Sequence, residues 1–322
     1  MVNTEEIELL TRVASLYYLE DATQAEIASL LGFSRPKVAR LLRKAKDEGI
    51  VEIAIRTHPA LNVKLESDVA TSFGLSQAIL VADQPNMESQ RRLVGRAGAD
   101  LLTRTLHEGS VVAIGMGRNV GAIPEQLTNP PERSCTFVSA IGGSRQVGTG
   151  VNSNDICRRL AEHFRGFVES LYAPPYAESA AGRETLLQHK DVREALSRAR
   201  TADILIVGIG DARDDSEVVQ MGCFSTIEMA RMRKAGAVGD MLGCFFDVHG
   251  APVAGGVEDR VVGLSVDDLR AIPRVIAVTS EPDKALAVLG ALRTGIPDVL
   301  ITTVGTAEQL LAATKGTRRS AP

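Results

Sequence analysis

The four cysteines of this 322-residue sequence lack the spacing of a metal site or a disulfide framework. No C-x-x-C pair occurs and no histidine pair lies near a cysteine, which excludes the usual zinc templates. The five histidines are scattered, and none has a carboxylate or serine at the spacing of a known catalytic site. We therefore expect free thiols in a reducing compartment, with no metal and no cofactor.

Long apolar runs and an excess of positive charge are also missing. No run of about 18 apolar residues is present, as a membrane-spanning helix requires. The N-terminal MVNTEEIELL is acidic where a signal peptide is basic, so the expected location is the cytoplasm with no membrane contact. The formal net charge is −4. A role in binding nucleic acid therefore requires basic residues that are concentrated locally.

The chain length and one sequence break predict two domains of unequal size. A chain of 322 residues exceeds the usual size of a single domain. Residues 5–56 form a helical, locally basic block, and His58-Pro59 interrupts this pattern. We place the boundary there, with a DNA-binding domain over 1–57 and an effector and oligomerisation domain over 58–322.

The segment TQAEIASLLGFSRPKVARLLRKAKDEGIVEIAI, residues 23–55, predicts two helices joined by a tight turn. Thr23 and Glu26 form a capping box that starts the first helix. Gly32 supplies the turn. Ser34 is placed to cap the second helix through the amide of Lys37, and a proline fits the first turn of that helix. VEIAI, residues 51–55, is predicted to form a wing strand.

The two helices have distinct apolar and basic faces. Ile27, Leu30 and Leu31 are expected to share the inner face of the first helix, and the second helix has an apolar stripe at i, i+3, i+4 and i+7. The stripe consists of Val38, Leu41, Leu42 and Ala45. A helix that enters the major groove needs base-reading side chains near its start and cations along its flanks. The candidate DNA contacts are Thr23, Gln24, Ser34, Arg35, Lys37, Arg40 and Arg43.

From about residue 75 the chain alternates short apolar runs with helical patterns, which predicts a mostly parallel, Rossmann-like sheet in an α/β domain. The segment 242–253 is predicted to form a hairpin-like insertion with its turn at His249-Gly250. The expected strands are 78–82, 111–115, 136–143, 204–210, 275–279 and 299–303, and the expected helices are 88–108, 154–165, 183–200, 225–235 and 282–293.

Glycines and carboxylates follow several of these strands. Gly115 and Gly117 after the second strand suit an anion-binding turn, to which Arg118 adds a charge. Gly142 and Gly143 would leave room for a ligand at the end of the third strand. Three further candidates are Gly210, Asp211 and Asp240. The carboxylates of the two aspartates can accept hydrogen bonds from sugar hydroxyls. The alternatives are closely packed turns for the glycines and Asx-turns or helix caps for the aspartates.

The stretch T-Q-x-E-I-A-x-x-L-G-x-S-R-x-x-V-x-R-L-L resembles the helix-turn-helix of SorC/DeoR-type sugar-responsive bacterial regulators. VVAIGMGRNV, ADILIVGIGD and KAGAVGDMLGCFFDVHGAPV resemble, in order, landmarks of that family's effector domain. The resemblance implies a regulator of a carbohydrate or polyol catabolic operon, with an effector domain similar to sugar-phosphate isomerases. It also implies double-stranded operator DNA and a phosphorylated sugar or polyol as ligands, and a homotetramer built as a dimer of dimers.

The same resemblance suggests roles for individual residues. Lys284 matches a lysine that contacts phosphate, and Asp240 matches the family's pattern. Four positions depart from that pattern. Asn119 stands in place of a threonine in the phosphate turn, Ser139 and Ile141 stand in place of glutamine and asparagine, and Thr303 replaces an acidic residue. The departures at Ser139 and Ile141 predict a less polar pocket.

Three other functions are open at this point. A nucleotide-dependent oxidoreductase fits poorly, because Gly121 lies one position too late for the G-x-G-x-x-G fingerprint. A sugar-phosphate isomerase would share the fold, although such an enzyme has little use for a DNA-binding motif. A helix-turn-helix that binds a protein is the third alternative, and salt-dependent binding to duplex DNA would distinguish it.

Overall fold

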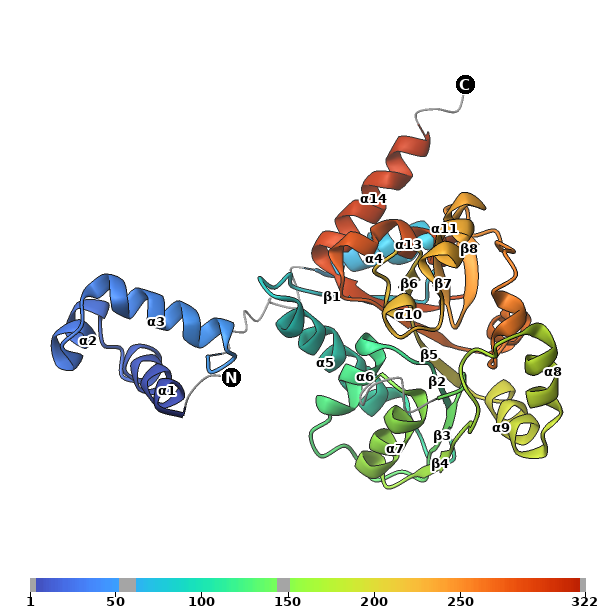
Figure 1. The fold of residues 1–322 in the computed structure, drawn as a ribbon, viewed down its shortest axis with the longest axis horizontal. Helices are drawn as coiled ribbons and strands as arrows, with labels where there is room; N and C mark the ends of the chain where they lie inside the picture. Colours follow the sequence, from blue (N-terminus) through green and yellow to red (C-terminus); the bar gives the residue numbers. More distant parts are fainter. Residues whose placement is uncertain (1–3, 52–61, 144–150, 319–322) are drawn as a thin grey trace. The chain divides into compact units, whose positions relative to one another are not determined.

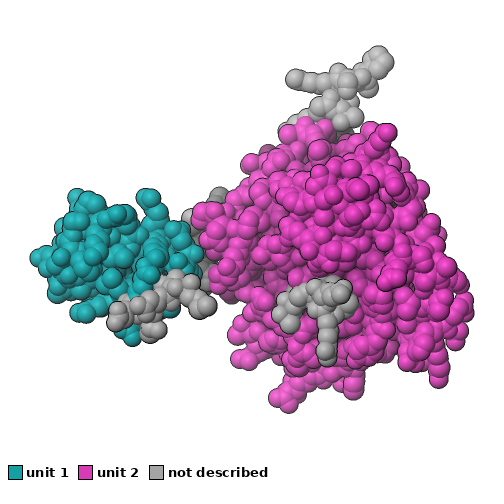
Figure 2. Space-filling view, viewed as in Figure 1, with its two compact units in different colours: residues 1–56 teal, residues 57–322 magenta. Residues whose placement is uncertain are grey.

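The computed structural model describes residues 4–51, 62–143 and 151–318. The chain divides into two compact units, residues 1–56 and residues 57–322 (Figure 2). Each unit has a hydrophobic core of its own.

Over residues 4–51, unit 1 consists of three helices packed around small apolar clusters, which are formed by Leu10, Val13, Ile27, Val38 and Leu42 with their neighbours. Most of the predicted wing strand lies outside the described residues. The helices are α1 (Thr4–Tyr18), α2 (Gln24–Leu31) and α3 (Arg35–Asp47) (Figure 1).

Unit 2 is built on a seven-stranded sheet with the order β1-β10-β9-β5-β2-β3-β4, in which every paired strand is parallel. The predicted α/β class with a mostly parallel sheet is confirmed. All six expected strands are present, and the short edge strand β4 is an addition. The strands are β1 (Gln77–Val81), β2 (Val111–Ile114), β3 (Thr136–Ser139), β4 (Phe167–Glu169), β5 (Ile204–Gly208), β9 (Val275–Val278) and β10 (Val299–Thr303).

Helices cover both faces of this sheet, so its central strands are buried on both sides. Alternate residues of each strand contribute to the two cores: Val112 and Ile114 pack on one side, and Val111 and Ala113 pack on the other. The first side is covered by α5 (Met87–Thr105), α6 (Arg118–Glu125) and α7 (Ser153–Phe164), and the second by α4 (Val63–Phe73), α9 (Lys190–Arg200), α12 (Val266–Ala271), α13 (Ala285–Arg293) and α14 (Val304–Arg318).

The helix expected over 183–200 is two helices in the structure, α8 (Ala180–Gln188) and α9, separated by His189 in an extended conformation. α9 buries an apolar stripe in the core, whereas α8 has no fully buried residue and only packs Leu186 and Leu187 against the core from outside. The remaining helical segments are α10 (Glu217–Gln220), α11 (Thr226–Lys234), η2 (Glu258–Arg260) and η3 (Pro282–Lys284).

A small antiparallel sheet lies beside the main one and is formed by β6 (Gly210–Asp211), β7 (Ala237–Met241) and β8 (Cys244–Asp247). The predicted turn at His249-Gly250 is present, since the Asp247 amide donates to the Ala251 carbonyl over 2.9 Å. The β7–β8 hairpin itself turns at Leu242 and Gly243, both with positive φ.

The strand order places a topological switch between β2 and β5. From β2 the chain winds outward to β3 and β4, and from β5 it winds the other way to β9 and β10. In open α/β sheets, ligands bind at the carboxyl ends of the strands at such a point. The fold therefore directs attention to the segments that follow β2, β5 and β9.

Candidate functional site

The predicted helix, turn and helix of unit 1 are confirmed, together with their caps. The Thr23 amide donates to the Glu26 carboxylate over 2.8 Å, and the Glu26 amide donates to Thr23 Oγ1 over 3.3 Å. α2 ends at Gly32, whose φ of +67° lies in the left-handed region. The Lys37 amide donates to Ser34 Oγ over 3.4 Å at the start of α3. These contacts fix where both helices begin.

The inner face of α2 differs from the expectation at one residue. Ile27 and Ala28 are buried and Leu31 is half-buried, whereas Leu30 is 65% exposed. Residues 27, 28 and 31 lie within about 100° on a helix, and residue 30 falls outside that arc. The prediction that Leu30 faces inward was wrong. The apolar stripe predicted for α3 is confirmed, with Val38, Leu42 and Ala45 buried and Leu41 half-buried.

The opposite side of α3 presents an exposed basic face. Lys37 Nζ lies 3.7 Å from the ring centroid of Phe33 in the turn, which holds this cation near the helix start. Lys44 forms an ion pair with Glu6 of α1 instead. Of the candidate DNA contacts, Thr23, Ser34, Arg35, Lys37, Arg40 and Arg43 are exposed, and Gln24 is half-buried.

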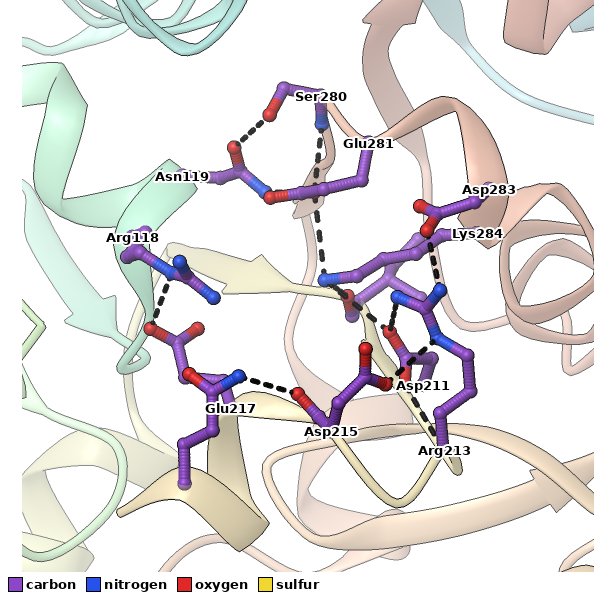
Figure 3. A network of polar contacts seen from close by, with 12 residues as sticks. Arg118, Asn119, Asp211, Arg213, Asp215, Glu217, Ser280, Glu281, Asp283 and Lys284 are labelled. Carbon is purple, nitrogen blue, oxygen red and sulfur yellow. Dashed lines mark hydrogen bonds and ion pairs between the residues drawn. The ribbon is translucent and has the colours of Figure 1, made fainter. Parts of the chain in front are cut away.

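In unit 2, segments that follow neighbouring strands line one pocket. β2 pairs with β5, and β5 pairs with β9, so their carboxyl ends lie side by side. The lining comes from residues 116–119, 208–211 and 216–218, with Asp240 from β7 and Lys284 after β9. Many of these side chains belong to one polar network (Figure 3).

The turn after β2 carries the cation at the pocket's edge. Gly117 precedes α6 and has no side chain that could cap its first amides. Arg118 Nε lies 2.9 Å from Glu217 Oε1. The Gly117 amide itself donates to the Val151 carbonyl over 2.9 Å. An anion at this turn would therefore interact with Arg118 and with the first turn of α6 rather than with the Gly117 amide.

Asn119 lines the pocket, but its amide group is engaged within the protein. Its Nδ2 donates to Glu281 Oε2 over 2.8 Å, and its Oδ1 accepts from Ser280 Oγ at 2.6 Å. Arg91 of α5 lies 3.7 Å from the other oxygen of Glu281. Burial opposes ionisation of Glu281, but Lys284, Asn119 and Arg91 together hold its pKa below the usual value. Asn119 thus ties the turn after β2 to the segment after β9.

Lys284 is largely buried, in contrast to the alternative of an ordinary surface lysine. Its side chain is 11% exposed, and its Nζ lies 3.5 Å from Glu281 Oε2 and 4.0 Å from Asp211 Oδ2. Nζ also donates to the Ile209 carbonyl over 3.4 Å. The ammonium group is therefore held inside the pocket by three partners.

Asp240 supplies a buried carboxylate with an unused acceptor. Its Oδ2 accepts from the Gly243 amide at 2.8 Å, whereas its Oδ1 has no hydrogen-bond partner among the described residues. Burial raises the pKa of Asp240 to about 6, against the opposing effects of that hydrogen bond and of Lys284. A Cβ on Gly210 would lie 2.0 Å from Asp240 Oδ1. Glycine is therefore required at this position for the carboxylate to lie where it does.

Asp211 forms an Asx-turn, which the sequence had left open as the alternative to binding a sugar hydroxyl. Its Oδ1 accepts from the Arg213 amide two residues later at 3.1 Å, and its Oδ2 lies 3.0 Å from Arg213 Nη2. Arg213 is also ion-paired with Asp283. Asp211 therefore lines the pocket mainly as a partner of cations that the protein supplies.

Sequence reasoning missed the contribution of the segment around α10. Ser216 and Glu217 both line the pocket, as does Met221 just after α10. Ser216 is buried, and its Oγ has no hydrogen-bond partner among the described residues. In the sequence this segment, GDARDDSEVVQ, has the composition of a polar loop, and no motif singles out these two residues.

Three of the predicted effector residues do not reach this pocket. A Cβ added to Gly142 would lie 2.4 Å from the Pro174 carbonyl oxygen, and a Cβ added to Gly143 would lie 2.2 Å from Asn152 Oδ1. Gly115 likewise packs against Leu242, at 3.0 Å from the Cβ position. These glycines permit close packing, so the expected room for a ligand at Gly142 and Gly143 is absent.

The departures at Ser139, Ile141 and Thr303 also lie outside the pocket. Ser139 and Ile141 are buried, and the Ser139 hydroxyl bonds to Asn154. Thr303 Oγ1 accepts from the Thr306 amide at 3.1 Å at the start of α14. The predicted loss of pocket polarity at Ser139 and Ile141 is therefore not observed, because neither side chain lines the pocket.

Within residues 4–51, 62–143 and 151–318, no cluster of three or more His, Cys, Asp or Glu is arranged to hold a metal ion. None of the helices in these ranges has the length and apolar character needed to cross a membrane.

Comparisons with known proteins agree along nearly the whole chain. A family model described as "Putative sugar-binding domain" matches residues 57–312. The chain is 30% identical over 313 residues to the transcriptional regulator LsrR of Klebsiella pneumoniae, covering 95% of this chain and 94% of that protein. It is 28% identical over 310 residues to the erythritol catabolism regulatory protein EryD of Brucella abortus, covering 96% and 98%. The crystal structure of the full-length sorbitol operon regulator SorC from Klebsiella pneumoniae has a TM-score of 0.74 at 28% identity, covering 96% of this chain and 100% of that one.

Proposed function

Because the chain belongs to the family of sugar-responsive transcriptional regulators of the SorC type, we propose that its affinity for operator DNA is controlled by a phosphorylated sugar or polyol bound in the unit 2 pocket. The chain is a transcriptional regulator and not an enzyme, since the relatives it matches over their full length are regulators. The sugar-phosphate isomerase alternative is therefore set aside.

The effector proposal depends on one observation: the same pocket contains a site for an anion and an acceptor for a hydroxyl. Arg118 and the start of α6 form a place for an anion, whereas Asp240 Oδ1 is a buried acceptor that has no donor within the part of the chain that the structure describes. Leaving a buried polar group unpaired costs about 1–3 kcal/mol. A hydroxyl that donates to Asp240 would remove this cost, so a ligand with a phosphate at one end and hydroxyls at the other matches the site.

The proposal assigns operator binding to unit 1. Its support is the exposed basic face of α3, a helix that follows the capping residue Ser34; this face includes Arg35, Arg40 and Arg43. As the resemblance to this family implies, we infer a homotetramer that acts in the cytoplasm, and such a symmetric oligomer would place pairs of α3 helices on pseudo-palindromic DNA. Sedimentation of the purified chain tests the tetramer.

The first experiment is a titration of the protein onto labelled DNA from upstream of its own gene and the neighbouring operon. Matched pairs of free and phosphorylated compounds, such as sorbitol and sorbitol 6-phosphate or erythritol and erythritol 4-phosphate, are then added. We expect one phosphorylated compound to change the DNA affinity and its free form to have little effect. Asp240→Asn should weaken this response without changing DNA affinity in the absence of ligand. Absence of DNA binding at every salt concentration would reject the proposal.

A further inference from the structure

The anion site at the start of α6 is already occupied by a carboxylate of the protein. Glu217, the first residue of α10, places Oε1 at 2.9 Å from Arg118 Nε (Figure 3). Its second oxygen, Oε2, lies 3.8 Å from the position that a Cβ on Gly117 would take. Both oxygens of Glu217 therefore lie over the Gly117-Arg118 turn, where an anionic ligand would bind.

The ion pair between Arg118 and Glu217 is exposed enough for a ligand to displace Glu217. The side chains of Arg118 and Glu217 are 45% and 24% exposed, so the pair lies at the edge of the pocket rather than in the core. Exposed ion pairs contribute about 0–1 kcal/mol to stability because solvent competes for both partners. A phosphate monoester carries more charge than a carboxylate and offers more acceptor oxygens, so it binds an arginine more strongly.

We propose that Glu217 is an internal occupant of the anion site and that a phosphorylated effector must displace it from Arg118. This inference rests on the proposed function and adds a residue that sets which effectors are recognised and at what concentration. In the absence of effector, Glu217 neutralises Arg118 and holds the start of α10 over the pocket. A neutral sugar cannot replace it on the arginine, whereas a phosphate can.

The neighbouring residues of α10 give the displacement a structural consequence. Ser216 precedes Glu217, and its buried hydroxyl has no partner among residues 4–51, 62–143 and 151–318, so a shift of α10 lets that hydroxyl bond to the ligand. Met221 follows α10 and lines both the effector pocket and a second cavity beside α8. Movement of Glu217 would therefore alter the second cavity as well.

Calorimetric titration with inorganic phosphate at fixed ionic strength tests the competition. Glu217→Gln removes the competing charge and should bind phosphate roughly three- to tenfold more tightly than the unaltered protein. Glu125→Gln is the matched control, because Glu125 lies in the adjoining cavity beside Arg118 but is paired with Arg159 at 3.5 Å. It should change phosphate affinity less than twofold. Arg118→Gln should abolish the gain that Glu217→Gln produces.

A second readout follows the movement of α10 directly. The sequence contains no tryptophan, so Gln220→Trp places a single fluorophore at an exposed position of α10. We expect inorganic phosphate to shift its emission at the concentrations that calorimetry gives. With Glu217→Gln also present, the emission should already be shifted before phosphate is added.

The outcomes separate this inference from the proposed function. Two results would show that Glu217 does not compete with phosphate: equal phosphate affinity for the unaltered protein and Glu217→Gln, or an equal gain in phosphate affinity in Glu217→Gln and Glu125→Gln. Either result leaves the regulator proposal standing. Saturating phosphate with no change in the tryptophan emission also overturns the displacement of Glu217. If no phosphorylated compound changes DNA binding and no variant binds phosphate, the anionic effector and this inference both fail.

Discussion

At Asp240, a carboxylate is buried at a cost in stability, which fits the binding role that we propose for this residue. The side chain is 5% exposed, and only one of its two oxygens has a partner among the described residues. A stable core would favour an apolar residue or a fully bonded polar one here. The unpaired oxygen is therefore best understood as a group kept ready for a ligand.

This arrangement predicts a pH-dependent gain in stability for Asp240→Asn. The pKa of Asp240 is raised to about 6 in the folded protein from its ordinary 3.8, mainly by burial. The native state therefore binds more protons than the unfolded state between about pH 4 and pH 6, and the stability contributed by Asp240 falls as pH rises through this range. Asp240→Asn should be more stable by about 1–3 kcal/mol at pH 7.5 and nearly equal to the unaltered protein at pH 4.

Urea unfolding at the two pH values measures this difference. Asp267→Asn is the control, because that carboxylate is 93% exposed and should show little difference at either pH. A loss of stability in Asp240→Asn at pH 7.5 would show that the carboxylate is stabilising in the absence of ligand, contrary to the argument.

At the scale of elements, the basic face of α3 makes a specific prediction for DNA binding. Arg40 is exposed on the side of α3 away from the core, one turn after the capped start. Loss of a base or phosphate contact costs about 1–3 kcal/mol, so Arg40→Ala should weaken operator binding about tenfold or more. Lys46→Ala removes an equal charge from the last turn, where Lys46 Nζ lies 5.8 Å from the ring centroid of Tyr18, and should have a smaller effect. Fluorescence anisotropy with labelled operator measures the affinity of both variants. Equal losses of affinity would mean that the position of the charge along α3 does not affect operator binding.

The elements that sequence predicted well are those whose signals are local. Caps at Thr23 and Ser34 and the alternation of strands and helices depend on neighbouring residues, and the structure confirms them. The role of a glycine after a strand is not local. Gly142 and Gly210 look alike in the sequence, but the first is packed on a distant carbonyl and the second on the Asp240 carboxylate. Ser216 and Glu217 reach the pocket because the chain brings them beside the residues that follow β2 and β5, which no local pattern indicates.

At the scale of the whole molecule, operator and effector must influence each other equally. If an effector changes the affinity for operator by some factor, the operator must change the affinity for that effector by the same factor. Calorimetry of the phosphorylated compound that alters DNA binding, with and without operator, should therefore give two dissociation constants that differ by this factor. Scrambled DNA of equal length is the control. Identical dissociation constants with and without operator would contradict coupling between the two units.

The pairing of β1 with β10 also constrains how the protein is made. Among the described residues, β1 is the first strand of unit 2 and pairs with the last one, from Gln77 with Val299 to Val81 with Thr303. A ribosome adds about 5–20 residues per second, so β1 waits for its partner for about 10–45 seconds after leaving the exit tunnel. Unit 1 is a separate compact unit with a hydrophobic core of its own, so it can fold during this interval. The newborn chain would therefore have a formed helix-turn-helix before it has an effector pocket, and a chain cut short before β10 would retain an exposed strand open to aggregation.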